Sequence, residues 1–141
     1  MKGKIVCDSS VMVKWVSSTG ENYLKQADKI LKDTQNNQTQ LFAPELSKYE
    51  VGNALLKGKG LSPTQAMLLL GTVYSMPIEF IPESLELAEK SYLYAKKYDI
   101  TYYDASFVSL THALNATLVT DNPKHQAKVV GVKVTPLEDY I

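Results

Sequence analysis

Two aspartates, Asp8 and Asp121, each follow a short run of residues suited to a buried β-strand. The run Ile5-Val6-Cys7 leads into Asp8, and residues 116–120 lead into Asp121. Ligands of open α/β sheets bind at the carboxyl ends of the strands, so in a parallel sheet both carboxylates fall on one edge. An ionised Asp is costly to bury without a partner. Each is therefore either an ordinary turn residue or a ligand of a site, and its position alone does not decide.

Two more acids, Glu50 and Asp104, stand beside apolar residues in helical patterns. Taken alone, Glu50 is typical of a solvated helix residue, and Asp104 is typical of an N-cap. Glu45 competes with Glu50, but we expect it in the first turn of its helix, where an acid favours the helix dipole. We therefore interpret Glu45 as structural.

Four converging carboxylates would need a cation, because like charges repel and no basic residue is predicted among them. Oxygen-rich sites of this kind suit Mg²⁺ or Mn²⁺. Ser10 and Thr120 would add hydroxyls, and Asn53 an amide. Such a centre cleaves phosphodiesters: the metal deprotonates a water and neutralises charge on the phosphate. His112 and His125 lack metal-ligand spacing, and the sequence has no convincing Ser/His/Asp or Cys/His arrangement.

The elements that would position these acids alternate between strand and helix. The sequence predicts strands over 4–7, 41–43, 78–81, 116–120 and 132–134, and helices over 11–16, 21–32, 44–57, 62–74, 83–98, 103–114 and 123–129. Pro44 is expected to open its helix, Tyr103 to begin a buried stripe, 33–40 to form a loop and 136–141 a tail. The alternation favours a parallel sheet covered by helices on both faces.

Composition favours a single domain over residues 1–141. The chain has 141 residues, 45% of them hydrophobic, which is enough for a core. Its 15 basic and 15 acidic residues cancel, so net charge argues for neither nucleic acid nor membrane binding. Cys7 is the only cysteine, which suits a reducing compartment. Because the opening residues are not typical of a signal peptide and no apolar run approaches membrane-spanning length, we expect a soluble, cytoplasmic protein without membrane contact.

Four segments resemble the PIN domain family and, within it, the VapC-like toxins of toxin–antitoxin pairs. They occur in the family's order and comprise residues 5–10 with 13–15, 44–46 with 49–55, 103–108, and 116–121. The resemblance implies a PIN-like three-layer α/β/α fold with a central parallel sheet of four or five strands. It also implies a Mg²⁺- or Mn²⁺-dependent endoribonuclease that hydrolyses RNA phosphodiester bonds with a metal-activated water.

The resemblance assigns roles to individual residues. It gives the catalytic and metal-binding role to Asp8, Glu50, Asp104 and Asp121, and a supporting role to Ser10, Asn53 and Thr120. It further implies a homodimer, and an antitoxin partner that inserts a segment near the site. Many members place the last acid two residues after the Thr, where this chain has Asn122. Asp121 is thus the least regular ligand and could act through water.

Two other functions compete with the nuclease. A phosphoacceptor, receiver-like signalling domain also has an Asp at a strand end and binds Mg²⁺. It needs an acidic pair after the first strand, however, and here Ser9 and Ser10 follow Asp8. A PIN-like domain kept as a non-catalytic binding module would not need the full set of acids. Tyr102 and Tyr103 could line the site, and some lysines could contact RNA phosphates; the candidates are Lys14, Lys57, Lys59 and Lys124.

Overall fold

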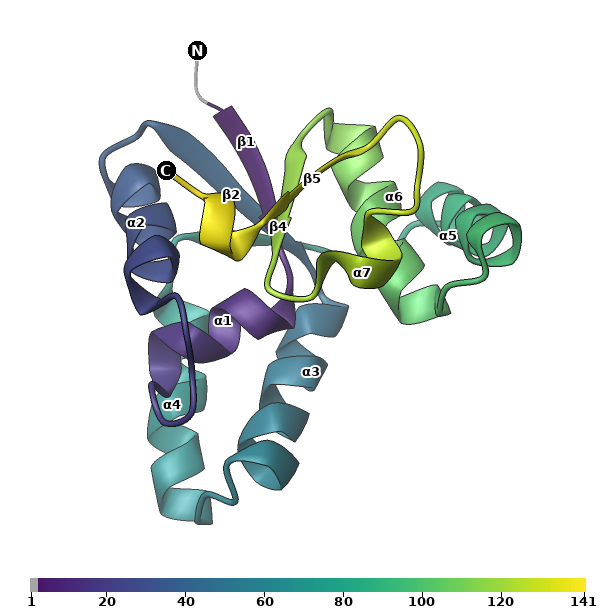
Figure 1. Cartoon of the computed structure of the whole chain (residues 1–141). Helices are drawn as coiled ribbons and strands as arrows, with labels where there is room; N and C mark the ends of the chain where they lie inside the picture. Colours follow the sequence, from purple (N-terminus) through teal and green to yellow (C-terminus); the bar gives the residue numbers. More distant parts are fainter. Residues whose placement is uncertain (1–2) are drawn as a thin grey trace.

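One parallel sheet of five strands forms the centre of the described chain (Figure 1). The structure is a computed structural model that describes residues 3–141, so the expectation about a signal peptide falls partly on Met1 and Lys2, outside the described residues. The strands are β1 (Gly3–Cys7), β2 (Thr39–Pro44), β3 (Ile78–Ile81), β4 (Thr117–Thr120) and β5 (Lys133–Pro136), in the order β3-β2-β1-β4-β5. Every ladder is parallel. The carboxyl ends of β1 and β4 therefore lie side by side, as predicted.

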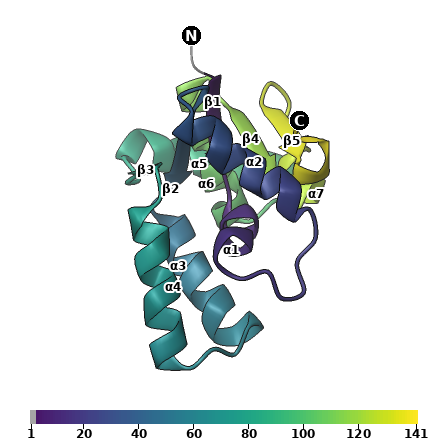
Figure 2. The ribbon, with the colours of Figure 1, turned by 90° about the vertical axis from the view of Figure 1, so that its left-hand side faces the viewer.

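Helices cover both faces of the sheet (Figures 1 and 2). Side chains alternate along β1: Ile5 and Cys7 join a core with α1, α2 and the α3–α4 region, whereas Val6 joins a core with α6. The predicted three-layer α/β/α arrangement is confirmed. The helices are α1 (Ser9–Val16), α2 (Leu24–Gln35), α3 (Leu46–Asn53), α4 (Pro63–Ser75), α5 (Leu85–Tyr98), α6 (Tyr102–Leu114) and α7 (Pro123–Gln126).

A helical hairpin extends from the carboxyl edge of the sheet. Both views show α3 and α4 running away from the strands side by side (Figures 1 and 2). A π-helical turn at Ala54–Gly58 continues α3, and a capping box on Ser62 and Gln65 starts α4, as the Ser-Pro-Thr-Gln sequence favours. The hairpin thus carries two predicted site residues, Glu50 and Asn53, on α3.

Pro44 ends β2 rather than opening a helix, so that prediction is wrong. The β1–β2 ladder stops at the pair Val6–Phe42, so Pro44 lies beyond it and needs no N–H on that side. The next residue, Glu45, donates its N–H to the Ile81 carbonyl at 3.0 Å. Glu45 is consequently the N-cap of α3.

Two segments predicted as loop and tail are largely ordered and pack together. The loop predicted over 33–40 shrinks to 36–38, because α2 reaches Gln35 and β2 starts at Thr39. The predicted tail contains a 3₁₀ helix, Leu137–Asp139, with Leu137 buried. The Tyr140 hydroxyl donates to Asp33 Oδ2 at 2.7 Å, and this tertiary contact stabilises both segments.

Tyr103 also departs from its prediction, since its side chain is 60% exposed. Helix α6 instead buries Phe107, Val108 and Leu110, because it lies between the sheet and α5. Among the described residues, no helix is both long and apolar enough to cross a membrane.

Candidate active site

Asp8 stands at the junction of β1 and α1, where it is the N-cap of the helix. Its Oδ1 accepts hydrogen bonds from the Ser10 N–H at 3.1 Å and from the Ser10 hydroxyl. Its Oδ2 accepts one from the Thr120 hydroxyl at the end of β4. Burial raises the pKa of Asp8, although these hydrogen bonds from Ser10 and Thr120 oppose the rise. Asp8 is thus a fixed, buried carboxylate with no ion-pair partner among the described residues.

Glu50 reaches the same place from α3. The Ser9 hydroxyl, next to Asp8, donates to Glu50 Oε1 at 3.2 Å. Burial raises the pKa of Glu50, and the nearby negative charges of Asp8 and Asp104 raise it further, against the effect of the Ser9 hydrogen bond. Glu50 therefore lies near enough to Asp8 and Asp104 for both charges to act on it.

Asp104 lies in the first turn of α6 and does not cap it. The cap is Thr101, whose hydroxyl oxygen accepts the Asp104 N–H at 3.0 Å. The Asp104 carboxylate is consequently left for other partners, and the interpretation of Asp104 as an N-cap is wrong. With the positive end of the helix dipole beside it, the first turn tolerates this charge.

Asp121 is placed differently. Its N–H donates to the Ser10 hydroxyl oxygen at 3.1 Å. The Ser10 hydroxyl in turn donates to Asp8, so one side chain links the Asp121 backbone to the Asp8 carboxylate. Its carboxylate, however, lies 3.0 Å from Lys14 Nζ. Asp121 therefore already has a cationic partner, which Asp8, Glu50 and Asp104 lack among the described residues.

Glu50 and Asp121 line two different hollows near the start of α1. Glu50 and Asn53 line one hollow with Ser9, Leu46, Tyr49 and Tyr103. Asp121 lines another with Ser10, Lys14, Glu21 and Lys59. Ala54 is the one residue that borders both.

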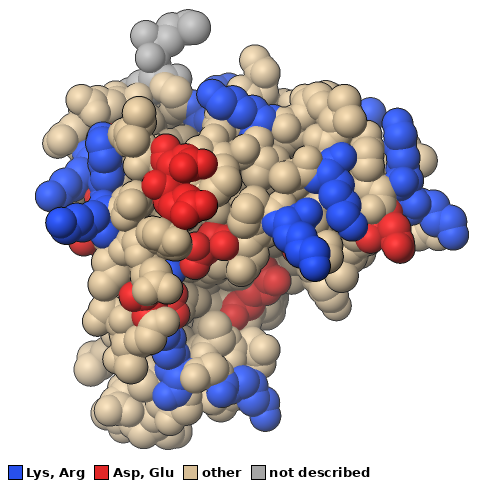
Figure 3. Space-filling view, in the orientation of Figure 1, with Lys and Arg blue, Asp and Glu red and all other residues tan. Residues whose placement is uncertain are grey.

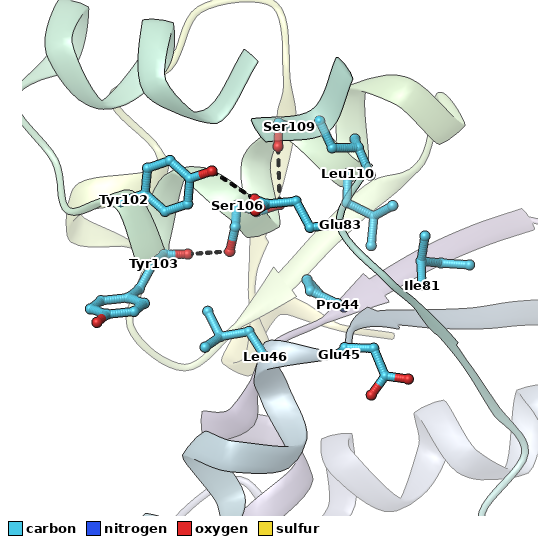
Figure 4. A pocket seen from close by; sticks show the side chains of 11 residues that line it. Pro44, Glu45, Leu46, Ile81, Glu83, Tyr102, Tyr103, Ser106, Ser109 and Leu110 are labelled. Carbon is cyan, nitrogen blue, oxygen red and sulfur yellow. Dashed lines mark hydrogen bonds between the residues drawn. The ribbon is translucent and has the colours of Figure 1, made fainter. Parts of the chain in front are cut away.

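A third, largely apolar pocket adjoins the Glu50 hollow through Leu46 and Tyr103 (Figure 4). It lies between the ends of β2 and β3 and the start of α6, and none of the four predicted acids lines it. The Tyr102 hydroxyl donates to Glu83 at 2.8 Å on its wall (Figure 4). Tyr103 thus lines both the Glu50 hollow and this pocket, whereas Tyr102 lines only the neighbouring pocket of the two.

The donor set fits a hard divalent cation. Asp8, Glu50 and Asp104 present carboxylate oxygens with Ser9 and Ser10 hydroxyls beside them, and such oxygens suit Mg²⁺ or Mn²⁺. In the part of the chain that the structure describes, no three Asp, Glu, His or Cys side chains already stand in a metal-ligand arrangement. Small rotations of carboxylate side chains would therefore have to accompany binding.

The surface around the site is acidic. Acidic side chains form a broken band down the middle of one face, from the C-terminal 3₁₀ helix towards α1 and α3 (Figure 3). Basic side chains lie to both sides of this band, over α2 and over α7 (Figure 3). An anionic substrate would meet unfavourable charge here unless a cation is bound first.

The comparisons decide the family. A family model described as PIN domain matches residues 5–131. This chain belongs to the PIN domain family. The predicted family is thereby confirmed, and this PIN domain has no match among the curated proteins compared.

Solved structures of similar fold include VapC and VapBC proteins. A VapBC2 chain from Rickettsia felis, in a structure with a promoter DNA fragment, has a TM-score of 0.72 at 17% identity, covering 94% of this PIN domain and 98% of that chain. A toxin–antitoxin complex chain from Klebsiella pneumoniae has a TM-score of 0.69 at 18% identity, covering 94% and 97%. VapC20 from Mycobacterium tuberculosis, described as a Sarcin-Ricin loop cleaving toxin, has a TM-score of 0.63 at 12% identity, covering 81% and 86%.

Two contacts of the site were not predicted from the sequence. The Ser9 hydroxyl donates to Glu50, and the position of Ser9 directly after Asp8 could have indicated this contact. Lys14, interpreted as a candidate for phosphate contact, is buried and paired with Asp121 and Glu21. Its position four residues after Ser10 on one helix face was the available signal.

Proposed function

We propose that this PIN domain is a Mg²⁺- or Mn²⁺-dependent endoribonuclease that hydrolyses RNA phosphodiester bonds. The observation that carries the proposal is that the charges of Asp8 and Asp104 both act on Glu50, and that none of the three acids has a basic partner among the described residues. Such a group of like charges is unfavourable unless a cation joins it. The PIN family and the site's oxygen donors support a divalent metal ion.

The chain's own residues would hold the ion and position it against the substrate. Asp8, fixed by Ser10 and Thr120, would be the rigid ligand, and Glu50 and Asp104 would close around the ion from α3 and α6. Asn53, on the wall of the Glu50 hollow, would orient a water or a phosphate oxygen. When bound, the ion would supply charge neutralisation at the phosphate and would lower the pKa of a water.

RNA is proposed as the substrate because of the fold and the local surface. VapC20, which shares the fold, is described as a toxin that cleaves the Sarcin-Ricin loop. In this chain, Lys57 and Lys124 are exposed and are the candidates for contact with backbone phosphates. Lys14 and Lys59 are instead engaged in ion pairs with Glu21.

A toxin role, with an antitoxin partner and a homodimer in the cytoplasm, completes the proposal. Structures of similar fold are described as toxin–antitoxin complexes. Large apolar side chains are exposed on the α3–α4 hairpin and on α5, and exposed apolar patches mark interaction surfaces. No observation favours the receiver-like alternative, and a non-catalytic module is an outcome that the following test can return.

A matched pair of Glu→Gln variants tests the nuclease. We expect Glu50→Gln to reduce Mg²⁺-dependent cleavage of a mixed RNA substrate by 100-fold or more, because it removes one charge from the metal site. Glu45→Gln should stay within threefold of the unmodified chain, since Glu45 stands at the N-terminal end of α3 and pairs with Lys48. A single-stranded DNA of the same sequence distinguishes RNA from DNA as substrate. Equal activity of both variants, or no cleavage by the unmodified chain with Mg²⁺ or Mn²⁺, would contradict the proposal.

A further inference from the structure

The Lys14 ammonium is buried at the edge of the candidate site. Its side chain is 1% exposed, and Nζ lies 2.9 Å from Glu21 Oε1 and 3.0 Å from Asp121 Oδ2. A buried charge is tolerated only when it is paired in this way. Because so little of Lys14 reaches the surface, it cannot serve as a free contact for a phosphate backbone.

Ion pairs extend from Lys14 into a small closed network. Glu21 Oε2 lies 2.7 Å from Lys59 Nζ, and Lys59 also donates to the Thr19 carbonyl. The chain Asp121–Lys14–Glu21–Lys59 thus contains two carboxylates and two ammonium groups, whose formal charges cancel. Asp121 therefore needs no further cation, in contrast to Asp8, Glu50 and Asp104.

One hydroxyl connects this neutral network to the acid cluster. The Ser10 hydroxyl donates to Asp8 Oδ1 and accepts the Asp121 N–H. The Asp121 carboxylate nevertheless faces the hollow with Lys14 and Glu21, whereas Glu50 faces the hollow on the other side of the start of α1. The Lys14 ammonium thus already stands against the Asp121 carboxylate as its cation.

We propose that Lys14 is the resident cation for Asp121, and that this PIN domain therefore binds one divalent ion, on Asp8, Glu50 and Asp104. This inference rests on the proposed metal-dependent function. Asp121, predicted from the family resemblance as a fourth ligand, becomes a member of the ion-pair network. Lys14 is a positioning residue: it holds the loop after β4 against α1 and keeps a second cation out.

Calorimetric titration of the full chain with Mn²⁺ tests the inference without measuring activity. We expect the unmodified chain to bind one Mn²⁺. Asp104→Asn should weaken that binding at least tenfold, whereas Asp121→Asn should change the Kd by less than threefold. Both changes replace one carboxylate by an amide, so each serves as the other's control. Two ions bound to the unmodified chain, or equal losses in the two variants, would overturn the inference.

Lysine variants test the cation itself. Lys14→Met leaves Asp121 without its cation, and we expect a second Mn²⁺ to bind per chain. Lys14→Arg keeps a positive charge, and Lys59→Met keeps the Lys14–Asp121 pair, so both should still bind one. A folded Lys14→Met chain that binds one ion would contradict the inference; if that variant does not fold, the comparison of Asp121→Asn with Asp104→Asn decides. An unmodified chain that binds no Mn²⁺ would refute the proposed function as well, whereas one that binds two would refute only this inference.

Discussion

The metal-free fold disfavours the charged form of the Asp8 carboxylate. It is 7% exposed, its partners are the neutral hydroxyls of Ser10 and Thr120, and its pKa is raised by burial. An acid whose pKa is raised by folding binds its proton more tightly in the folded state. Stability then falls as the pH rises from the unfolded pKa through the folded one. At a pH above that window, ionised Asp8 therefore costs stability that a bound cation would restore.

Replacing Asp8 should consequently stabilise the metal-free chain. We expect Asp8→Asn to raise the Tm at pH 7 in the presence of a chelator by a few degrees, as a gain of about 1 kcal/mol does for a domain of roughly this size. The gain should shrink as the pH falls towards the folded pKa of Asp8. Differential scanning calorimetry of Asp8→Asn and of Asp28→Asn, an exposed acid on α2, makes the measurement. A lower Tm for Asp8→Asn alone would show that its hydrogen bonds outweigh its burial.

Mn²⁺ should reverse the order of these two proteins. A ligand that binds only the folded state stabilises it by about 2.7 kcal/mol at a concentration 100 times its Kd. We expect this gain in the unmodified chain and in Asp28→Asn, and its loss in Asp8→Asn. The same calorimeter, with Mn²⁺ in place of the chelator, records the difference. Equal stabilisation of all three proteins would place the metal elsewhere.

At the scale of elements, the sequence predicted the features that depend on hydrophobic periodicity and on the direction of the strands. Strand-to-acid junctions at Asp8 and Asp121 were predictable, because parallel strands end on one edge. The role of Pro44 was not, since it depends on where the β1 ladder stops. The ends of α2 and of the chain were missed for a related reason: Asp33 and Tyr140 stabilise each other across 107 positions of sequence. The Lys14–Asp121 pair is equally non-local, so residue types alone suggested four ligands.

The contact between the C-terminal helix and α2 should contribute measurably to stability. Tyr140→Phe removes the hydroxyl that donates to Asp33, and a hydrogen bond to a charged group is worth about 1.5–3 kcal/mol. Burial opposes the ionisation of Asp33, but Tyr140 and Lys29 more than offset it and lower its pKa. The loss should therefore appear in urea unfolding at pH 7 and fade as the pH falls below the folded pKa of Asp33.

Tyr23→Phe is the matched control for that contact. It removes the Tyr23 hydroxyl that donates to Glu138 at 3.2 Å on the exposed surface, where water can replace the bond. We expect a change below about 0.5 kcal/mol, as is usual for surface substitutions. If Tyr23→Phe destabilises the chain as much as Tyr140→Phe does, the two hydrogen bonds contribute equally and the burial of Asp33 is not what matters.

At the scale of the whole molecule, apolar surface is exposed in two places. Leu56, Met67, Leu68 and Tyr74 are exposed on the α3–α4 hairpin, and Leu85, Tyr92 and Leu93 are exposed on α5. The hairpin stands clear of the sheet (Figure 2), so none of the described elements covers its outer side. Exposed apolar side chains that gather into a patch mark interaction surfaces. Two surfaces would serve the two proposed protein partners, a second copy and an antitoxin.

The proposed homodimer should use one of these surfaces and leave the other free. Light scattering of the chain at tens of micromolar should then give twice its mass of 15.7 kDa. Leu68→Glu and Tyr92→Glu each place a charge at the centre of one surface, where burial in an interface would be strongly unfavourable. We expect one variant to become monomeric and the other to remain dimeric with an unchanged Tm, which identifies the surface available to the antitoxin. A monomeric unmodified chain, or a dimer that neither charge disrupts, would show that these apolar surfaces do not hold two copies together.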